Sequence, residues 1–231
     1  MGLTIHEASV RRSARHSVFV VIASLVTSVA AAQAARPDTV TLPPILPESV
    51  EVALALSAAP PDVSRDAAVW VLRRGGFVRV RAGGPDGLTC LVQRDHAESL
   101  YPLCYDAEAS RTILPIALEE QRLREQRHSF AEIDRTMQEA IAAGRFTPPA
   151  RLAVSYMMSP RQVLFAGPTG RRVGRWMPHV MLYSPNLSVA RLGLTAAALR
   201  VLSVQDDGKP TSHVVVAVPR WSDGTPAVAP R

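Results

Sequence analysis

The sequence predicts an α+β fold: a mostly antiparallel sheet, made of an N-terminal meander and C-terminal strands, with a central helix pair. Three observations favour this class. Apolar and polar residues alternate within 69–94, apolar residues recur at helical spacing over 114–144, and short apolar segments return from residue 152 onward. Period two indicates strands, and recurrence every three or four residues indicates helices. Strands on both sides of a helical segment are typical of the α+β class.

The first 34 residues are expected to be a secretory signal peptide. Three arginines within the first 15 residues precede the apolar run 17–32, and Ala32 and Ala34 place small residues at the cleavage position. A retained membrane anchor is the alternative, but the run is shorter than the roughly 20 apolar residues of a spanning helix. We therefore expect cleavage after Ala34, a periplasmic or secreted location, and no transmembrane helix after cleavage.

A proline-rich segment, 35–49, follows and predicts an extended lead-in to a single domain over 50–220. The segment 48–60 fits either a short helix that ends at a Pro-Pro pair or, from its Val and Leu content, a strand, and we favour the helix. The next segment, 69–94, predicts an antiparallel meander with two tight turns, one at Arg-Gly-Gly and one at Gly-Pro-Asp-Gly.

The central helices are predicted over 114–127 and 129–144. Ser129 and Glu132 have the spacing of a capping box, and Gly144 stands where a left-handed C-terminal cap is usual. The second helix has one apolar stripe, which predicts packing residues rather than a cofactor contact. The stripe consists of Phe130, Ile133, Met137 and Ile141.

The C-terminal strands are separated by Gly, Pro and Asn turns, and a tail over 221–231 is expected to be flexible. The strand segments are 152–159, 162–166, 178–184 and 213–219.

The two cysteines, Cys90 and Cys104, are predicted to form a structural disulfide. An even cysteine count in an exported chain makes a disulfide the default. Redox use is disfavoured because a redox pair normally has the Cys-x-x-Cys spacing. A disulfide over this loop would contribute about 3 kcal/mol to stability.

Candidate metal ligands lie between the cysteines. Asp95, His96 and Glu98 alternate carboxylate and imidazole groups, which can bind a cation. The sequence contains no calcium-loop, zinc-helix or paired-cysteine motif, so a solvated loop is the favoured interpretation and no cofactor is expected.

The candidate catalytic residue is His179, which stands among apolar neighbours at the start of a strand, where burial shifts a histidine pKa. A hydrolase-like site would combine it with Asp106 or Glu108. A hydrogen-bonded structural histidine is the favoured alternative, because neither a Gly-x-Ser-x-Gly elbow nor a phosphate-binding loop accompanies it.

The charge pattern disfavours nucleic-acid binding. The formal net charge is +6, but the arginines are scattered, Lys209 is the single lysine, and aromatic residues make up 5% of the chain. A nucleic-acid surface needs clustered basic residues with interleaved aromatics.

The chain resembles a set of small exported bacterial proteins with no assigned activity. The motifs that carry the resemblance are Thr-Cys-Leu-Val, Leu-Cys-Tyr-Asp-Ala-Glu, Tyr-Met-Met-Ser-Pro and Pro-His-Val-Met-Leu-Tyr, within 54–183. The region after Asn186 lies outside it. The resemblance implies an exported bacterial protein and assigns no ligand, partner or catalytic residue.

Export, a disulfide and the lack of a recognised catalytic motif favour a non-enzymatic envelope protein that binds a small ligand or a partner. Whether the chain is an enzyme stays open, although we favour binding. The alternative is a hydrolase-like enzyme using His179 with Asp106 or Glu108, and a metal-binding protein is a weaker alternative.

Overall fold

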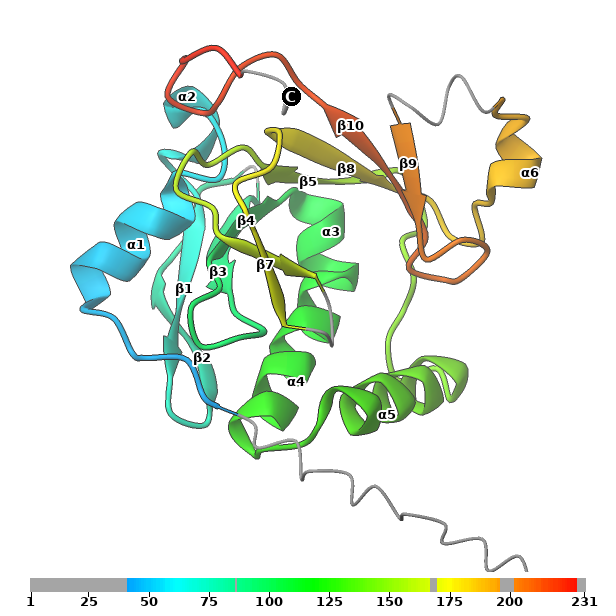
Figure 1. The fold of residues 1–231 in the computed structure, drawn as a ribbon, viewed down its shortest axis with the longest axis horizontal. Helices are drawn as coiled ribbons and strands as arrows, with labels where there is room; N and C mark the ends of the chain where they lie inside the picture. The colour runs from blue at the N-terminus through cyan, green and yellow to red at the C-terminus, as the bar shows by residue number, and fades with distance from the viewer. Residues whose placement is uncertain (1–40, 86, 167–169, 196–201, 228–231) are drawn as a thin grey trace, which may run out of the picture. The chain divides into compact units, whose positions relative to one another are not determined.

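An eight-stranded sheet, in the order β2-β1-β3-β4-β5-β8-β10-β9, forms the body of the protein (Figure 1). The computed structural model describes residues 41–85, 87–166, 170–195 and 202–227, all within the compact unit Arg36–Arg231. The strands are β1 Ala68–Arg73, β2 Gly76–Arg81, β3 Thr89–Gln93, β4 Tyr101–Tyr105, β5 Ala153–Met157, β6 Leu164–Ala166, β7 Arg171–Gly174, β8 His179–Tyr183, β9 Leu202–Gln205 and β10 His213–Ala217. The helices are α1 Glu48–Leu56, α2 Pro61–Ser64, α3 Ala107–Thr112, α4 Leu114–Glu125, α5 Phe130–Ala142 and α6 Val189–Leu192. The predicted α+β class, mostly antiparallel sheet and disulfide are confirmed.

The N-terminal half of the sheet corrects the predicted meander. The hairpin β1–β2 forms as expected, but β3 pairs in parallel with β1 instead of following β2. The reason lies in the glycines after β2. A Cβ on Gly83 would stand 2.8 Å from the backbone nitrogen of Ala68, and the Gly84 amide donates to the Asp66 carbonyl. These glycines therefore let the chain cross against the start of β1, rather than making a hairpin turn.

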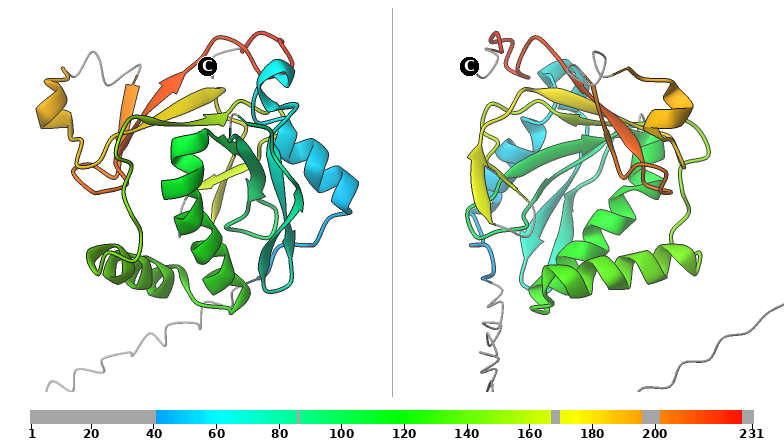
Figure 2. Two further views of the ribbon diagram at one scale, coloured as in Figure 1. Left: turned by 180° about the vertical axis from the view of Figure 1, so that it is seen from behind. Right: turned by 45° about the vertical axis from the view of Figure 1, so that its right-hand side comes forward.

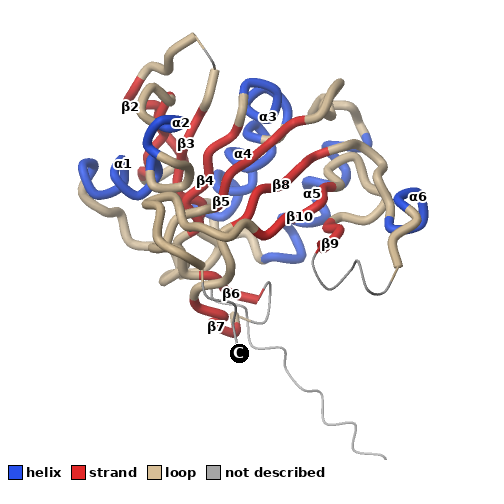
Figure 3. Tube along the Cα trace, turned by 90° about the horizontal axis from the view of Figure 1, so that it is seen from above, coloured by secondary structure: helices blue, strands red, loops and turns tan. Residues whose placement is uncertain are grey.

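The C-terminal half of the sheet is antiparallel, and β10 lies between β8 and β9. Seen from above, β4, β5, β8 and β10 run side by side, while the hairpin β6–β7 stands apart from this row (Figure 3). Neither β7 nor β9 was predicted. Three of the four residues of β7 are exposed, so this strand lacks the alternation that marks a half-buried strand.

One face of the sheet is covered by α1, and the other by α3 and α4 (Figure 2). Beneath α1, a buried cluster contains Leu54, Ala55, Val69 and Val71 together with the disulfide. Cys90 and Cys104 are directly opposite each other in the β3–β4 pair, so the disulfide joins neighbouring strands. The favoured helix within 48–60 is thus confirmed as α1, although it ends at Leu56, before the Pro-Pro pair. Its buried face packs on the disulfide side of the sheet.

A buried ion pair anchors α1 to the sheet. The Arg94 guanidinium donates to the Glu51 carboxylate at 2.6 Å, and both side chains are 1% exposed. Arg94 also donates to the Pro44 carbonyl, which fixes the lead-in segment beside α1.

The helical layer follows the predicted boundaries closely. Ser129 and Glu132 form the expected capping box at the start of α5, and Gly144 has the expected positive φ of 70° after its end. A short helix, α3, precedes the predicted pair and is capped by Asp106, whose carboxylate accepts from the Ala109 amide. In the predicted stripe of α5, Ile133 and Met137 are buried and the other two side chains are half-buried.

Part of the tail is packed. We expected flexibility from residue 221, yet Trp221 and Ser222 are buried, and the Ser222 amide donates to the Met158 carbonyl. The predicted signal peptide lies outside the described residues. Within the described ranges, no helix is long and apolar enough to cross a membrane.

Candidate functional site

A cavity of about 770 Å³ lies between the sheet and the helices α4 and α5. Its floor is formed by inward-facing residues of β4, β5, β8 and β10, and its other walls by α4, α5 and the β6–β7 hairpin. Much of the lining is apolar, and sites for small molecules are mostly apolar cavities of about 300–1,000 Å³ with a few placed polar groups. The apolar lining includes Leu103, Ile113, Ile116, Met137, Ile141, Met181 and Val215.

Four charged residues form a wall of this cavity: Asp95, Glu120, Arg124 and Asp134. The same four residues line a second hollow of about 690 Å³, beside Phe130 and the β3–β4 loop. The two hollows therefore meet at a cluster of charges, which we call the charged wall.

Arg124 is the buried cation of the charged wall. Its side chain comes from the last turn of α4 and is 9% exposed. The guanidinium lies over the Phe130 ring, 5.0 Å from the ring centroid. Its Nε is enclosed without a hydrogen-bond partner, and among the described residues no carboxylate lies within ion-pair distance of Arg124. Burial lowers the pKa of Arg124, opposed by the charges of Glu120 and Asp95.

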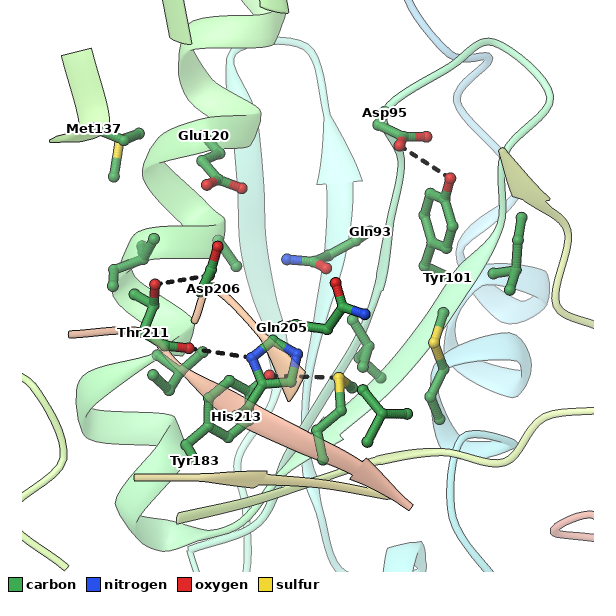
Figure 4. A pocket seen from close by; sticks show the side chains of 18 of the residues that line it. Gln93, Asp95, Tyr101, Glu120, Met137, Tyr183, Gln205, Asp206, Thr211 and His213 are labelled. Carbon is green, nitrogen blue, oxygen red and sulfur yellow. Dashed lines mark hydrogen bonds between the residues drawn. The ribbon is translucent and has the colours of Figure 1, made fainter. Parts of the chain in front are cut away.

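Glu120 and Asp95 supply oxygen atoms to the same wall. Burial raises the pKa of Glu120, and the Arg124 charge opposes that rise. Asp95 Oδ2 accepts from the Tyr101 hydroxyl at 2.9 Å, while Asp95 Oδ1 is enclosed without a partner among the described residues. In Figure 4, Glu120 projects from α4, and Asp95 is joined to Tyr101 on β4.

The opposite wall comes from the end of the sheet around β10. His213 lies against the Tyr183 ring at a centroid distance of 4.7 Å, and its Nδ1 is 3.1 Å from the Thr211 carbonyl (Figure 4). A carbonyl accepts only, so Nδ1 carries the proton and Nε2 of the neutral ring is an acceptor. Asp206 is satisfied by Thr211 and Lys209, at 2.7 Å and 3.7 Å. Burial raises the pKa of Tyr183 to about 12, so its hydroxyl stays protonated.

His179, the predicted catalytic residue, also lines the cavity. It begins β8, is 4% exposed, and its ring packs against Trp176 at a centroid distance of 4.8 Å. Its Nδ1 donates to the Met177 carbonyl at 2.8 Å, and burial lowers its pKa. His179 is therefore a neutral imidazole at neutral pH.

The structure does not bring Asp106 or Glu108 to His179. His179 on β8 pairs with Met157 on the neighbouring strand β5, whereas the Asp106 amide donates to the Val154 carbonyl, also on β5. Met157 and Val154 are about 10 Å apart along β5, and β5 itself lies between His179 and Asp106. The Glu108 carboxylate instead accepts from the Ala150 amide and from two arginines, Arg111 and Arg151. The Ala150 hydrogen bond is the main reason that the pKa of Glu108 is lowered.

The predicted metal ligands Asp95, His96 and Glu98 do not form one site. Asp95 belongs to the charged wall, and the His96 ring packs between Phe130 and Phe165 at centroid distances of 5.1 and 4.9 Å. Across the described ranges, no three His, Cys, Asp or Glu side chains are gathered in a way that could hold a metal ion. Glu98 does not line either hollow.

Arg124 and Glu120 were missed as site residues in the sequence, although a signal for them exists. Ala117, Glu120 and Arg124 recur every three or four residues on one face of α4, and Ile113, the N-cap residue, continues this spacing. This face changes from apolar to charged toward the C-terminal end of the helix, and such a change marks a buried face that meets a polar site.

Comparison with known proteins finds no matching family model, no matching curated protein and no matching solved structure.

Proposed function

We propose that this is an exported bacterial protein of the periplasm or cell exterior that binds a small, partly apolar molecule in the cavity between the sheet and helices α4 and α5. The observation that carries the proposal is the 770 Å³ cavity, with a largely apolar lining and a wall of charged groups that includes the buried Arg124. The predicted signal peptide and the resemblance to exported bacterial proteins support the location.

Binding accounts for the polar groups of the cavity better than structural packing does. A buried polar atom without a partner costs about 1–3 kcal/mol. Four side chains that line the cavity each carry one such atom: Arg94, Asp95, Gln121 and Arg124. Groups of this kind, gathered beside an apolar cavity, are typical of a site whose bonds are completed by a ligand.

Hydrolysis is not the favoured function, because the carboxylates expected to assist His179 are engaged elsewhere. Asp106 caps α3 and Glu108 is bonded to Ala150, Arg111 and Arg151. The imidazoles of His179 and His213 are neutral acceptors, and a binding site uses such groups without any covalent step.

The test is native mass spectrometry of the chain recovered from a bacterial periplasm without reductant, followed by the same sample denatured. We expect a non-covalent adduct that is lost on denaturation. The denatured mass would also locate the signal cleavage and show the loss of two hydrogens at the disulfide.

Two variants of α5 provide the matched comparison. Ile141 lines the cavity and is half-buried, whereas its neighbour Ala142 is exposed and does not line it. Ile141→Trp should abolish the adduct and Ala142→Trp should keep it. Titration with the fluorophore 8-anilinonaphthalene-1-sulfonate repeats the comparison if the natural ligand dissociates during recovery. Equal dye binding by both variants, with no adduct in either, would overturn the proposal.

A further inference from the structure

The charged groups of the cavity fall into paired and unpaired sets. Among its three cations, Arg94 is bonded to Glu51 at 2.6 Å and Lys209 to Asp206 at 3.7 Å, whereas Arg124 has no carboxylate within 4.0 Å in the described structure. The carboxylates show the same division. Asp95 accepts from Tyr101, Asp134 accepts from Gln138, and Asp206 accepts from Thr211.

Glu120 is the carboxylate of the cavity left without a hydrogen bond or ion pair to any described residue. Its spacing makes this notable, because Glu120 and Arg124 are at i and i+4 on α4 in the orientation that favours an ion pair. The contact with Phe130 explains why they stay apart. The Arg124 guanidinium is held over that ring, so Glu120 and Arg124 line the same hollow without forming a direct ion pair.

We propose that the ligand is a zwitterion of the amino-acid type with an apolar side chain. Its carboxylate is bound by Arg124 and its ammonium group by Glu120, with the enclosed Asp95 oxygen nearby. This inference rests on the proposed ligand-binding function and names the class of ligand.

Charge complementarity favours a zwitterion over a simple anion or cation. An anion alone would satisfy Arg124 but would meet the carboxylates of Glu120, Asp95 and Asp134 on the same wall. A cation alone would leave Arg124 buried and unpaired, which costs several kcal/mol for an ion in a protein interior. A zwitterion supplies one charge of each sign, and its binding leaves the net charge of the site unchanged.

The lining beside the charged wall determines the rest of the ligand. Ile116 on α4 and Met137 and Ile141 on α5 lie on the helix side, and Met181 and Val215 on the sheet side. These side chains offer no hydrogen bonds, so they favour a large apolar side chain such as phenylalanine, leucine or tryptophan. The cavity volume leaves space for ordered water beside a single amino acid.

The test is isothermal titration of the refolded, ligand-free protein with L-phenylalanine, L-leucine and L-tryptophan. Two analogues of phenylalanine then separate the charges: 3-phenylpropanoate lacks the ammonium group, and phenethylamine lacks the carboxylate. We expect at least one amino acid to bind and each analogue of phenylalanine to bind at least about tenfold more weakly than phenylalanine, since one charged hydrogen bond contributes about 1.5–3 kcal/mol.

Matched variants on α4 assign the binding to the named side chains. Arg124→Gln and Glu120→Gln should each weaken binding at least about tenfold. Arg122→Gln and Glu119→Gln should not, because Arg122 and Glu119 bind each other outside the cavity. Binding that survives Arg124→Gln would overturn the inference.

The outcome also separates this inference from the proposed function. If no amino acid binds, but a native adduct of another chemistry is lost in Ile141→Trp, the cavity is a ligand site and the zwitterion is wrong. If neither an adduct nor any probe distinguishes Ile141→Trp from Ala142→Trp, the proposed function itself fails.

Discussion

At the scale of single residues, Arg124 illustrates a conflict between stability and binding. A buried guanidinium without a carboxylate partner is costly in the folded protein, and the Phe130 contact returns only about 0.5–2 kcal/mol of that cost. A stability cost of this kind is the trade-off expected of a residue whose role is to contact a ligand.

This conflict predicts the effect of Arg124→Met. Methionine fills a similar space without a charge, so the free energy of unfolding should rise by about 1 kcal/mol or stay unchanged. Arg122→Met, at an exposed site on the same helix, should change it by less than about 0.5 kcal/mol. Urea unfolding measures both. A loss of more than about 1 kcal/mol in Arg124→Met would show that the arginine is structural.

At the scale of elements, the ion pair Glu51–Arg94 connects α1 to the sheet with both charges removed from water. The exposed pair Glu48–Arg73 begins one turn earlier on the same helix, and its side chains are 56% and 34% exposed. The two pairs therefore differ chiefly in burial.

We expect Glu51→Gln to lower the free energy of unfolding by about 3–5 kcal/mol, because Arg94 would remain buried without its counterion. Glu48→Gln should cost less than about 1 kcal/mol, since exposed ion pairs contribute little. Chemical denaturation with matched urea slopes tests the contrast. Similar losses in both variants would mean that the buried charge of Arg94 is reached by water.

Elements that depend on local signals could be predicted from the sequence, and pairings between distant segments could not. The capping box at Ser129 and the turn glycines of the β1–β2 hairpin are local signals, and both were confirmed. The parallel pairing of β3 with β1 was missed because the same alternation suits a strand beside either neighbour, and the choice depends on contacts between distant residues. His179 was identified as a site candidate by its apolar neighbours. Its place in one cavity with Arg124 and Glu120 could not be predicted, because the three residues line the same space only once α4 packs against the sheet.

At the scale of the whole molecule, the cavity makes stability depend on pH. Burial lowers the pKa of His179 and of His213 from the ordinary value of 6.5. The unfolded chain therefore binds more protons than the folded protein just below that pH, so stability is lost as the pH falls through this window. Glu120 acts in the opposite sense. Its pKa is raised by burial, with Arg124 lowering it and Asp206, Asp134 and Asp95 raising it further, so its contribution is lost as the pH rises above 4.5.

We expect the free energy of unfolding to fall as the pH is lowered from about 7.5 to about 5.5, by about 1.4 kcal/mol for each pKa unit of histidine depression. In a His179→Gln/His213→Gln variant this fall should shrink, and adding Glu120→Gln should remove the opposing contribution. Urea titrations across the pH range provide the measurement. An unchanged pH profile in the double histidine variant would contradict the assignment of this pH dependence to His179 and His213.

The junction between β4 and β5 has a consequence for the biosynthesis of the protein. In the described part of the chain, two register pairs join the halves of the sheet, Cys104 with Tyr156 and Tyr105 with Ser155, next to the hydrogen bond from the Asp106 amide to the Val154 carbonyl. All strands on one side of this junction come from residues 68–105, and all strands on the other side from 153–217. A chain that is exported from its N-terminus, as we propose, can therefore pair β1 to β4, cover them with α1 and close the disulfide before the later strands have crossed the membrane. We expect β4 to serve afterwards as the template edge on which β5, β8, β10 and β9 assemble.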